Sequence, residues 1–162
     1  MGAKDTFFPI KRTLNAGGRL IDLHTPKVMG IINLTPDSFY AGSRFSGENS
    51  IVKEAQQMLD HGADMLDLGA YSSRPGAEDI SAGEETSRLI PAVGAISKSF
   101  PQAIISVDTF RSSVAEAAIN AGAHIINDIS GGSLDAQMSE TVSRLQVPYV
   151  LMHMPGNPKT MQ

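Results

Sequence analysis

The chain has 162 residues, of which 41% are hydrophobic and 19% charged, a composition typical of one globular domain or part of one. Its formal net charge of −4 argues against a basic nucleic-acid-binding face, and the absence of cysteine excludes disulfides and thiolate ligands. Any bound metal must therefore use oxygen or histidine ligands, which favours hard cations. No apolar stretch reaches the roughly 20 residues that span a bilayer, so we expect a cytoplasmic protein that binds neither membrane nor nucleic acid.

Residues 10–24 alternate apolar and polar side chains around a Gly-Gly pair, which predicts a β-hairpin ahead of the main domain. Beyond Pro26, short continuous apolar runs alternate with longer helical patterns, as expected for parallel strands buried on both faces. We divide the chain into an N-terminal extension with a hairpin, residues 1–27, and a main domain, residues 28–162. The predicted strands are residues 28–33, 65–69, 104–108, 125–128 and 148–153.

The helices between these strands have recognisable ends. Ser81 followed three residues later by Glu84 is a capping box, which begins a helix over about residues 81–98. The preceding helix, about residues 50–61, ends at Gly62, a residue suited to the left-handed cap. Two further helices are predicted at about residues 112–120 and 135–146.

The alternation predicts an α/β fold, a (β/α)₈ TIM barrel of which about five β/α units are present. Residues 61–67 are similar to residues 121–127, and in each segment the predicted end of a helix is followed by a buried strand. The units repeat at about 30 residues, the period of a barrel of roughly 250 residues, so we expect the later units to be missing. A doubly wound open sheet is the competing architecture, but no Gly-x-Gly-x-x-Gly follows the first strand.

Polar residues end every predicted strand, where a barrel builds its active site. Each has a plain structural explanation, since Asp108 would cap the next helix and Asn127 would satisfy loop backbone groups. Together they favour a site for a polar heterocycle and an anion, because stability alone asks for no polar group at every strand end. These residues are Asn33, Ser72, Ser73, Arg74, Asp108, Asn127, Asp128 and His153.

The side-chain chemistry suggests roles for four of these residues. Asp108 would accept N–H groups from a guanidine-like ring edge and stabilise positive charge on that ring, while Asn127 offers both a donor and acceptors. Arg74 would hold a carboxylate or a phosphate, and Asn33 would give its amide oxygen to Mg²⁺. The connections at residues 34–47 and 70–80 are long for β/α loops, which predicts that they are functional.

Two segments, residues 29–39 and 67–76, resemble the two signatures of dihydropteroate synthases. Residues 106–109, 126–132 and 151–158 then follow in that family's order, so the resemblance covers nearly everything from Val28 onward. It implies a transferase of folate biosynthesis that joins 6-hydroxymethyl-7,8-dihydropterin pyrophosphate to p-aminobenzoate, giving 7,8-dihydropteroate and pyrophosphate with Mg²⁺ assisting. It also implies a sulfonamide target, and a homodimer when the protein is full length.

The resemblance assigns roles residue by residue. Asn33 would bind Mg²⁺, and Asp108, the catalytic residue, would grip the pterin edge with Asn127 and steady the cationic pterin. Ile129 and Met152 would pack on the ring. The residues implied at the pyrophosphate and p-aminobenzoate sites are Phe39, Ser73, Arg74 and Pro75.

The sequence departs from the family pattern in three ways. Ala41 stands where the first motif usually has Asp, and Tyr71 replaces the acid of the second motif. The family's later Lys, Arg and His motifs have no counterpart before Gln162, which leaves open whether this chain turns over by itself. Two alternatives remain: a pterin-binding or dimerising fragment without turnover, and a pterin-dependent methyltransferase domain that donates to a corrinoid.

Overall fold

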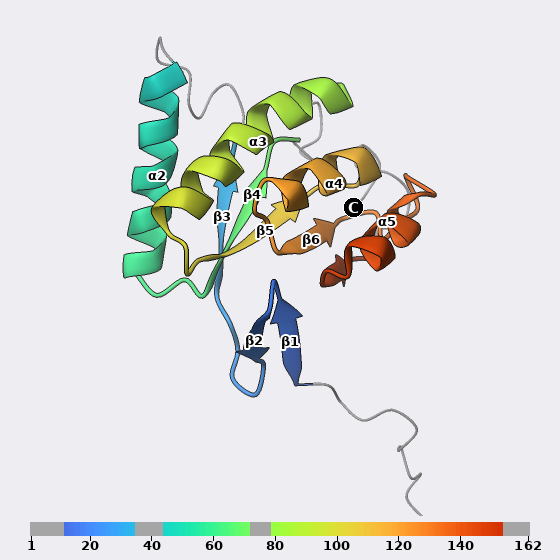
Figure 1. The fold of residues 1–162 in the computed structure, drawn as a ribbon, viewed down its shortest axis with the longest axis horizontal. Helices are drawn as coiled ribbons and strands as arrows, with labels where there is room; N and C mark the ends of the chain where they lie inside the picture. The colour runs from blue at the N-terminus through green and yellow to red at the C-terminus, as the bar shows by residue number, and fades with distance from the viewer. Residues whose placement is uncertain (1–11, 35–43, 72–78, 154–162) are drawn as a thin grey trace, which may run out of the picture.

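The structure, a computed structural model, describes residues 12–34, 44–71 and 79–153, with the backbone alone at residues 44–48. Within these ranges the chain forms a two-stranded hairpin and a five-stranded parallel sheet whose outer face is covered by helices (Figure 1). The strands of the sheet are β3 (Met29–Asn33), β4 (Met65–Gly69), β5 (Ile104–Asp108), β6 (Ile125–Asp128) and β7 (Tyr149–Leu151).

The strand order confirms the predicted barrel. The sheet runs β3-β4-β5-β6-β7, so every strand pairs with the next one along the chain. In a doubly wound sheet the strand order reverses, because later strands are added on the other side of the first one. In a (β/α)₈ barrel each new strand is added on the same side until the sheet closes. The chain therefore has an α/β fold, part of a TIM barrel.

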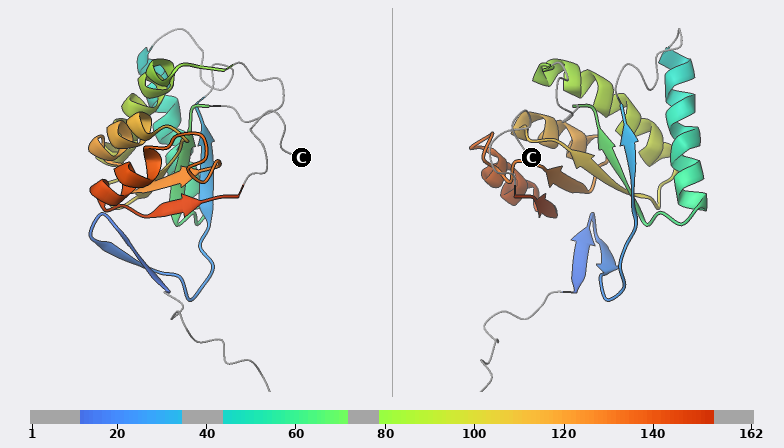
Figure 2. Two further views of the ribbon diagram at one scale, coloured as in Figure 1. Left: turned by 90° about the vertical axis from the view of Figure 1, so that its right-hand side faces the viewer. Right: turned by 180° about the vertical axis from the view of Figure 1, so that it is seen from behind.

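Four helices lie against the outer face of the sheet, as the side views show (Figure 2). Leu66 and Leu68 of β4, Val107 of β5 and Ile126 of β6 point outward and are fully buried beneath them. Alternate residues of each strand point the opposite way, towards the barrel interior. The helices are α2 (Arg44–Asp60), α3 (Ala82–Ser99), α4 (Ser112–Asn120) and α5 (Met138–Leu145).

The ends of two helices differ from the prediction. Helix α2 begins at Arg44 rather than near Ser50. The sequence pattern did not include its first residues, because they carry no apolar periodicity. Helix α5 begins at Met138 rather than Asp135. The Asp135 carboxylate instead accepts a hydrogen bond from the backbone N–H of Ser112, over 2.7 Å, and so caps the neighbouring helix α4. Strand β7 is also shorter than predicted.

The predicted hairpin is present as β1 (Thr13–Ala16) and β2 (Arg19–Asp22), and it lies beneath the N-terminal ends of the sheet strands (Figure 1). Gly17 and Gly18 form its turn with φ values of 60° and 84°, which only glycine adopts readily at both positions. Ala16 is fully buried against Met65, Ile104 and Ile125. The hairpin thus closes the lower end of the barrel interior and leaves the upper end for a site. None of the helices in the described ranges is both long and apolar enough to cross a membrane.

Candidate functional site

Strand register brings three of the predicted strand-end residues, Asn33, Asp108 and Asn127, onto one face. Residues paired across parallel strands point to the same side, so each row of partners forms one layer of the barrel interior. The upper row is Asn33, Gly69, Asp108 and Asn127, and the row beneath it is Ile31, Asp67, Ser106 and Ile125. Ile31 is 61% exposed, which shows that this inner face is open beside β3.

Asp108 stands in the middle of the upper row. Burial, together with the negative charges of Asp67, Glu85 and Asp128, raises the pKa of Asp108 to about 7. Its neighbour in the row is Gly69, where a Cβ would lie 3.6 Å from Asp108 Oδ2. The missing side chain therefore leaves space directly beside the carboxylate. A carboxyl group poised to change charge near neutral pH, next to open space, is typical of a functional site.

Asn127 and Asp67 form a polar floor beside Asp108. The Asn127 side-chain amide donates to Asp67 Oδ2 over 2.9 Å. Buried polar atoms normally find partners, so the unpaired ones point to a missing ligand. Three such atoms lie on this inner face, and they are Asp67 Oδ1, Ser106 Oγ and Asn127 Oδ1.

Sequence reasoning missed Asp67 and Ser106. Asp67 is 5% exposed and Ser106 is fully buried. Both lie inside apolar runs that were interpreted only as buried strands. Their spacing could have identified them. Asp67 lies two residues before Gly69, the end of β4, and Ser106 lies two residues before Asp108, the end of β5. A period of two places them on the same face as the strand-end residues.

Asn33 ends β3 at the edge of the upper row, with its side chain exposed. The next residue, Leu34, donates its backbone N–H to the carbonyl oxygen of Gly69 over 2.7 Å, which extends the β3–β4 pairing to the rim. No cluster of three acidic or histidine side chains able to hold a metal occurs among residues 12–34, 44–71 and 79–153. Mg²⁺ keeps several waters and needs few protein ligands when substrate phosphates complete its shell, so the amide oxygen of Asn33 would be compatible with this ion.

Ile129 and Met152 follow β6 and β7 at the same rim and are half-buried. The Met152 backbone N–H donates to the carbonyl oxygen of Asp128 over 3.2 Å, which fixes these two strand ends side by side. Asp128 itself is fully buried, and its carboxylate is occupied by the protein, so it serves the loop rather than a ligand. It accepts from the Ser130 backbone and hydroxyl, the Gly132 backbone and the Tyr149 hydroxyl.

The structural explanation for Asp108 does not hold. Helix α4 has Arg111 at its N-cap without a side-chain cap hydrogen bond, and the cap is supplied by Asp135. Asp108 therefore does not cap α4. Five other predicted site residues lie outside the described residues, and they are Phe39, Ser72, Ser73, Arg74 and Pro75.

A hollow of about 400 Å³ opens at the opposite end of the strands and contains none of the predicted site residues. It lies between the ends of α2 and α3 and the starts of β4 and β5. Its lining consists of Leu59, Ala63, Asp64, Phe100, Pro101, Gln102 and Ala103. Since barrels place their chemistry at the C-terminal ends of the strands, the rim with Asp108 is the stronger candidate.

The sequence profile of a family described as pterin binding enzyme matches residues 29–162. The mitochondrial folate synthesis bifunctional protein of Pisum sativum is 54% identical over 138 residues, which cover 83% of this chain and 27% of the pea protein. The dihydropteroate synthase of Escherichia coli K12 is 46% identical over 149 residues, which cover 92% of this chain and 52% of that enzyme. The chain thus spans about half the length of this bacterial relative.

Solved structures agree with these sequence matches. The Xanthomonas albilineans dihydropteroate synthase with 4-aminobenzoic acid superposes with a TM-score of 0.82 at 39% identity, over 91% of this chain and 54% of that one. The same enzyme in complex with 7,8-dihydropteroate gives a TM-score of 0.75 at 37% identity, over 88% and 51% of the two chains.

Proposed function

The chain belongs to the family of pterin binding enzymes, and we propose that it forms the pterin-binding part of a dihydropteroate synthase. The reaction joins 6-hydroxymethyl-7,8-dihydropterin pyrophosphate to p-aminobenzoate. The bond between the pterin methylene carbon and the pyrophosphate oxygen breaks, the amine nitrogen bonds to that carbon, and one amine proton is lost. The products are 7,8-dihydropteroate and pyrophosphate.

The observation that supports this function best is the set of acceptors around Asp108. Asp67 Oδ1 and Asn127 Oδ1 are buried without partners. The Asp108 carboxylate lies beside Asn127 in the upper row, one row above Asp67. A ligand that satisfies them must present several N–H donors from one edge, since carboxylate and amide oxygens only accept. The amino-pyrimidinone edge of a pterin carries such donors. A site of this kind rejects analogues that lack them, because its polar atoms would stay unpaired.

Asp108 carries the central role in this proposal. With a pKa near 7 in the free protein, its carboxyl group is partly protonated at neutral pH. N–H donors from the pterin favour the ionised form, so binding lowers this pKa and produces the charge that the reaction needs. The carboxylate then stabilises positive charge on the ring as the carbon–oxygen bond breaks. Ile129 and Met152, half-buried at the same rim, would pack against the ring.

The remaining roles rest on the resemblance and on chemical fit. Asn33 would hold Mg²⁺ through its amide oxygen at the open edge of the upper row. When bound, the metal would neutralise charge on the departing pyrophosphate. Ser73 and Arg74, with Phe39 and Pro75, would contribute to the p-aminobenzoate and pyrophosphate sites, where sulfonamides would compete. A homodimer and a cytoplasmic location stay predictions from the sequence.

Pterin binding tests the proposal directly. In a version of the protein that spans the length of its bacterial relatives, 7,8-dihydropteroate is titrated calorimetrically into the parent and into Asp108→Ala. We expect the affinity to fall about a hundredfold, since a buried charge-assisted contact is lost. Asp60→Ala, at an exposed position of α2, is the matched control. Equal affinity of parent and Asp108→Ala would remove Asp108 from the site.

Release of pyrophosphate separates the alternatives. The parent is incubated with dihydropterin pyrophosphate, p-aminobenzoate and Mg²⁺, and pyrophosphate is measured over several turnovers. A dihydropteroate synthase releases it only when both substrates are present. A pterin-dependent methyltransferase or a binding fragment would bind pterin and release none.

A further inference from the structure

Asp128 ends β6, directly after Asn127 of the upper row, and its side chain is fully buried. None of the ion pairs among the described residues includes it. Its two oxygens instead accept hydrogen bonds from within the protein. Oδ1 accepts from the backbone N–H and the hydroxyl of Ser130, both over 2.8 Å. Oδ2 accepts from the backbone N–H of Gly132 over 2.9 Å and from the hydroxyl of Tyr149 over 2.6 Å. The carboxylate therefore lies at the centre of the loop that follows β6.

Tyr149 connects this loop to the neighbouring strand. The other donors to Asp128 belong to the loop itself, whereas Tyr149 begins β7. Burial and the hydrogen bond to Asp128 raise the pKa of Tyr149, so its hydroxyl stays protonated and donates at neutral pH. An aspartate that accepts from backbone N–H groups shortly after it stabilises a tight turn. The tyrosine hydroxyl joins that turn to β7.

The backbone makes the same connection. The carbonyl oxygen of Asp128 accepts the N–H of Met152 over 3.2 Å and the N–H of Gly131 over 3.1 Å. Gly131 also passes so close to the end of β7 that an added Cβ would overlap the carbonyl oxygen of Met152. The turn after β6 and the end of β7 are therefore in direct contact. Because closely packed groups transmit displacements, a shift of the turn would move Met152 as well.

Ile129 and Met152, the two residues expected to pack on the pterin ring, both lie at this contact. Ile129 stands between Asp128 and Ser130, whose side chains are hydrogen-bonded to each other. Met152 is bonded through its backbone N–H to Asp128. The placement of both residues at the rim thus depends on the same buried aspartate.

Building on the proposed function, we propose that Asp128 and Tyr149 are positioning residues for the pterin ring. They act through Ile129 and Met152, because they fix the apolar surface against which the face of the ring packs. The upper row, with Asp108, binds the polar edge of the ring. A carboxylate has about four acceptor positions, and protein donors fill those of Asp128, so it does not contact the substrate itself.

The test compares Tyr149→Phe and Asp128→Asn with the parent, in a version that spans the length of the bacterial relatives. Phenylalanine keeps the ring, removes only the hydroxyl, and leaves the charge of Asp128 in place. Asparagine puts an NH₂ group where two donors already point, which breaks two of the hydrogen bonds. All measurements are made at pH 8, above the pKa of about 7 of Asp108, so that the lost charge of Asp128 does not alter its ionisation.

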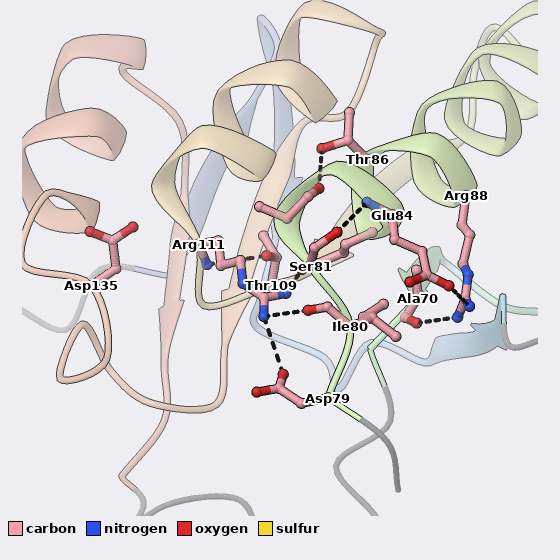
Figure 3. Close-up of polar contacts among 12 residues, drawn as sticks. Ala70, Asp79, Ile80, Ser81, Glu84, Thr86, Arg88, Thr109, Arg111 and Asp135 are labelled. Atoms are coloured by element: carbon pink, nitrogen blue, oxygen red, sulfur yellow. Dashed lines mark hydrogen bonds and ion pairs between the residues drawn. The ribbon is translucent and has the colours of Figure 1, made fainter.

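The measured quantities are the Kd of 7,8-dihydropteroate, the KM of each substrate and the urea midpoint. Thr86→Val is the matched control, since it also removes one half-buried hydroxyl. Thr86 donates to the carbonyl oxygen of Ala82 over 2.7 Å within α3, outside the sheet (Figure 3).

We expect the Kd of 7,8-dihydropteroate and the KM for dihydropterin pyrophosphate to rise together. The rise should be about fivefold in Tyr149→Phe, which loses one hydrogen bond, and about twentyfold in Asp128→Asn, which loses two. The KM for p-aminobenzoate should stay within about twofold, and Thr86→Val should match the parent in all three constants. A selective effect on the pterin distinguishes positioning from a general loss of stability.

Equal rises in both KM values, or a lower urea midpoint with unchanged pterin affinity, would overturn the positioning role. If Asp128→Asn fails to fold, Tyr149→Phe decides by the same constants. A parent that binds 7,8-dihydropteroate without turnover would contradict the proposed reaction, and the Kd values would still decide the role of Asp128 and Tyr149. A parent that binds no pterin would contradict both.

Discussion

Asn127 of β6 donates its side-chain amide to Asp67 Oδ2 of β4 over 2.9 Å, across the intervening strand β5. This hydrogen bond fixes the orientation of the amide, because the nitrogen is occupied and the oxygen is left unpaired. Asn127 is therefore held as an acceptor towards the barrel interior. Asp67 in turn keeps one free oxygen. The free oxygens of Asp67 and Asn127 therefore form one group of hydrogen-bond acceptors beside Asp108.

Asp67→Asn tests the electrostatic half of this relationship. The charge of Asp67 is one cause of the raised pKa of Asp108, after burial. Removing that charge should lower the pKa of Asp108, so the carboxylate forms at lower pH. Under the proposed function the ionised form binds the pterin donors, so the pH midpoint of 7,8-dihydropteroate binding should move to a lower value. Calorimetric titrations at several pH values measure it, and an unmoved midpoint would show that Asp67 does not act on Asp108.

Asp108→Asn should stabilise the chain in a pH-dependent manner. The raised pKa, from 3.8 to about 7, means that the folded state binds more protons than the unfolded state between these values. The free energy of unfolding therefore falls as pH rises from about 4 to about 7. Asparagine avoids this loss. The urea midpoint of Asp108→Asn should exceed that of the parent at pH 8 and match it near pH 4.

Asp60→Asn is the control for that experiment, because Asp60 is exposed at the end of α2 and accepts from Gln56 over 2.7 Å. Its urea midpoint should follow that of the parent at both pH values. A gain for Asp108→Asn that is equal at pH 4 and pH 8 would contradict the assignment of a buried charge. The same variant should bind pterin more weakly, so stability and binding oppose each other at this position.

Gly69→Ala should weaken pterin binding without unfolding the protein. The added Cβ would lie 3.5 Å from the Asp108 Cβ and 3.6 Å from its Oδ2, which is ordinary contact and leaves the strand undisturbed. It would nevertheless fill the space beside the carboxylate where the ligand's N–H groups must approach. We expect about a tenfold loss of 7,8-dihydropteroate affinity. The urea midpoint should change little.

Gly94→Ala provides the comparison, since a Cβ at Gly94 inside α3 meets nothing within 4 Å. Alanine favours a helix over glycine by about 0.5–1 kcal/mol, so this variant should be more stable and bind pterin normally. If Gly69→Ala also binds normally, the space beside Asp108 is not part of the pterin site.

Gly17→Ala and Gly18→Ala together test how the hairpin closes the base of the barrel. Both residues have positive φ, so each alanine costs about 1 kcal/mol or more of backbone strain. Only at Gly17 would the Cβ also meet a side chain, 2.6 Å from His124 Cδ2, whereas Gly18 has open space. Gly17→Ala should therefore lower the urea midpoint further. Equal midpoints would mean that the hairpin does not pack on His124.

Sequence patterns predicted the fold well because its signals are local. The continuous apolar runs gave β4, β5 and β6 with the observed bounds, and the Ser81 hydroxyl accepts from the Glu84 backbone over 3.1 Å as the capping box requires. Gly62 has a φ of 97° after α2. The first turns of α2 escaped prediction, since they have no periodic apolar pattern. Helix α5 was predicted to begin at Asp135, whose carboxylate caps α4 instead.

The sequence by itself determined the alternation of strands and helices, the bounds of β4, β5 and β6, and the family, because these depend on neighbouring residues and on continuous motifs. Only the tertiary structure decided which side chains share a surface. Register placed Asp67 and Ser106 beside Asp108 and Asn127, and packing made Asp135 the cap of α4. Arg111 meets Glu85, 26 residues earlier, for the same reason. Such contacts depend on how the strands pair and the helices pack, and no local pattern records them.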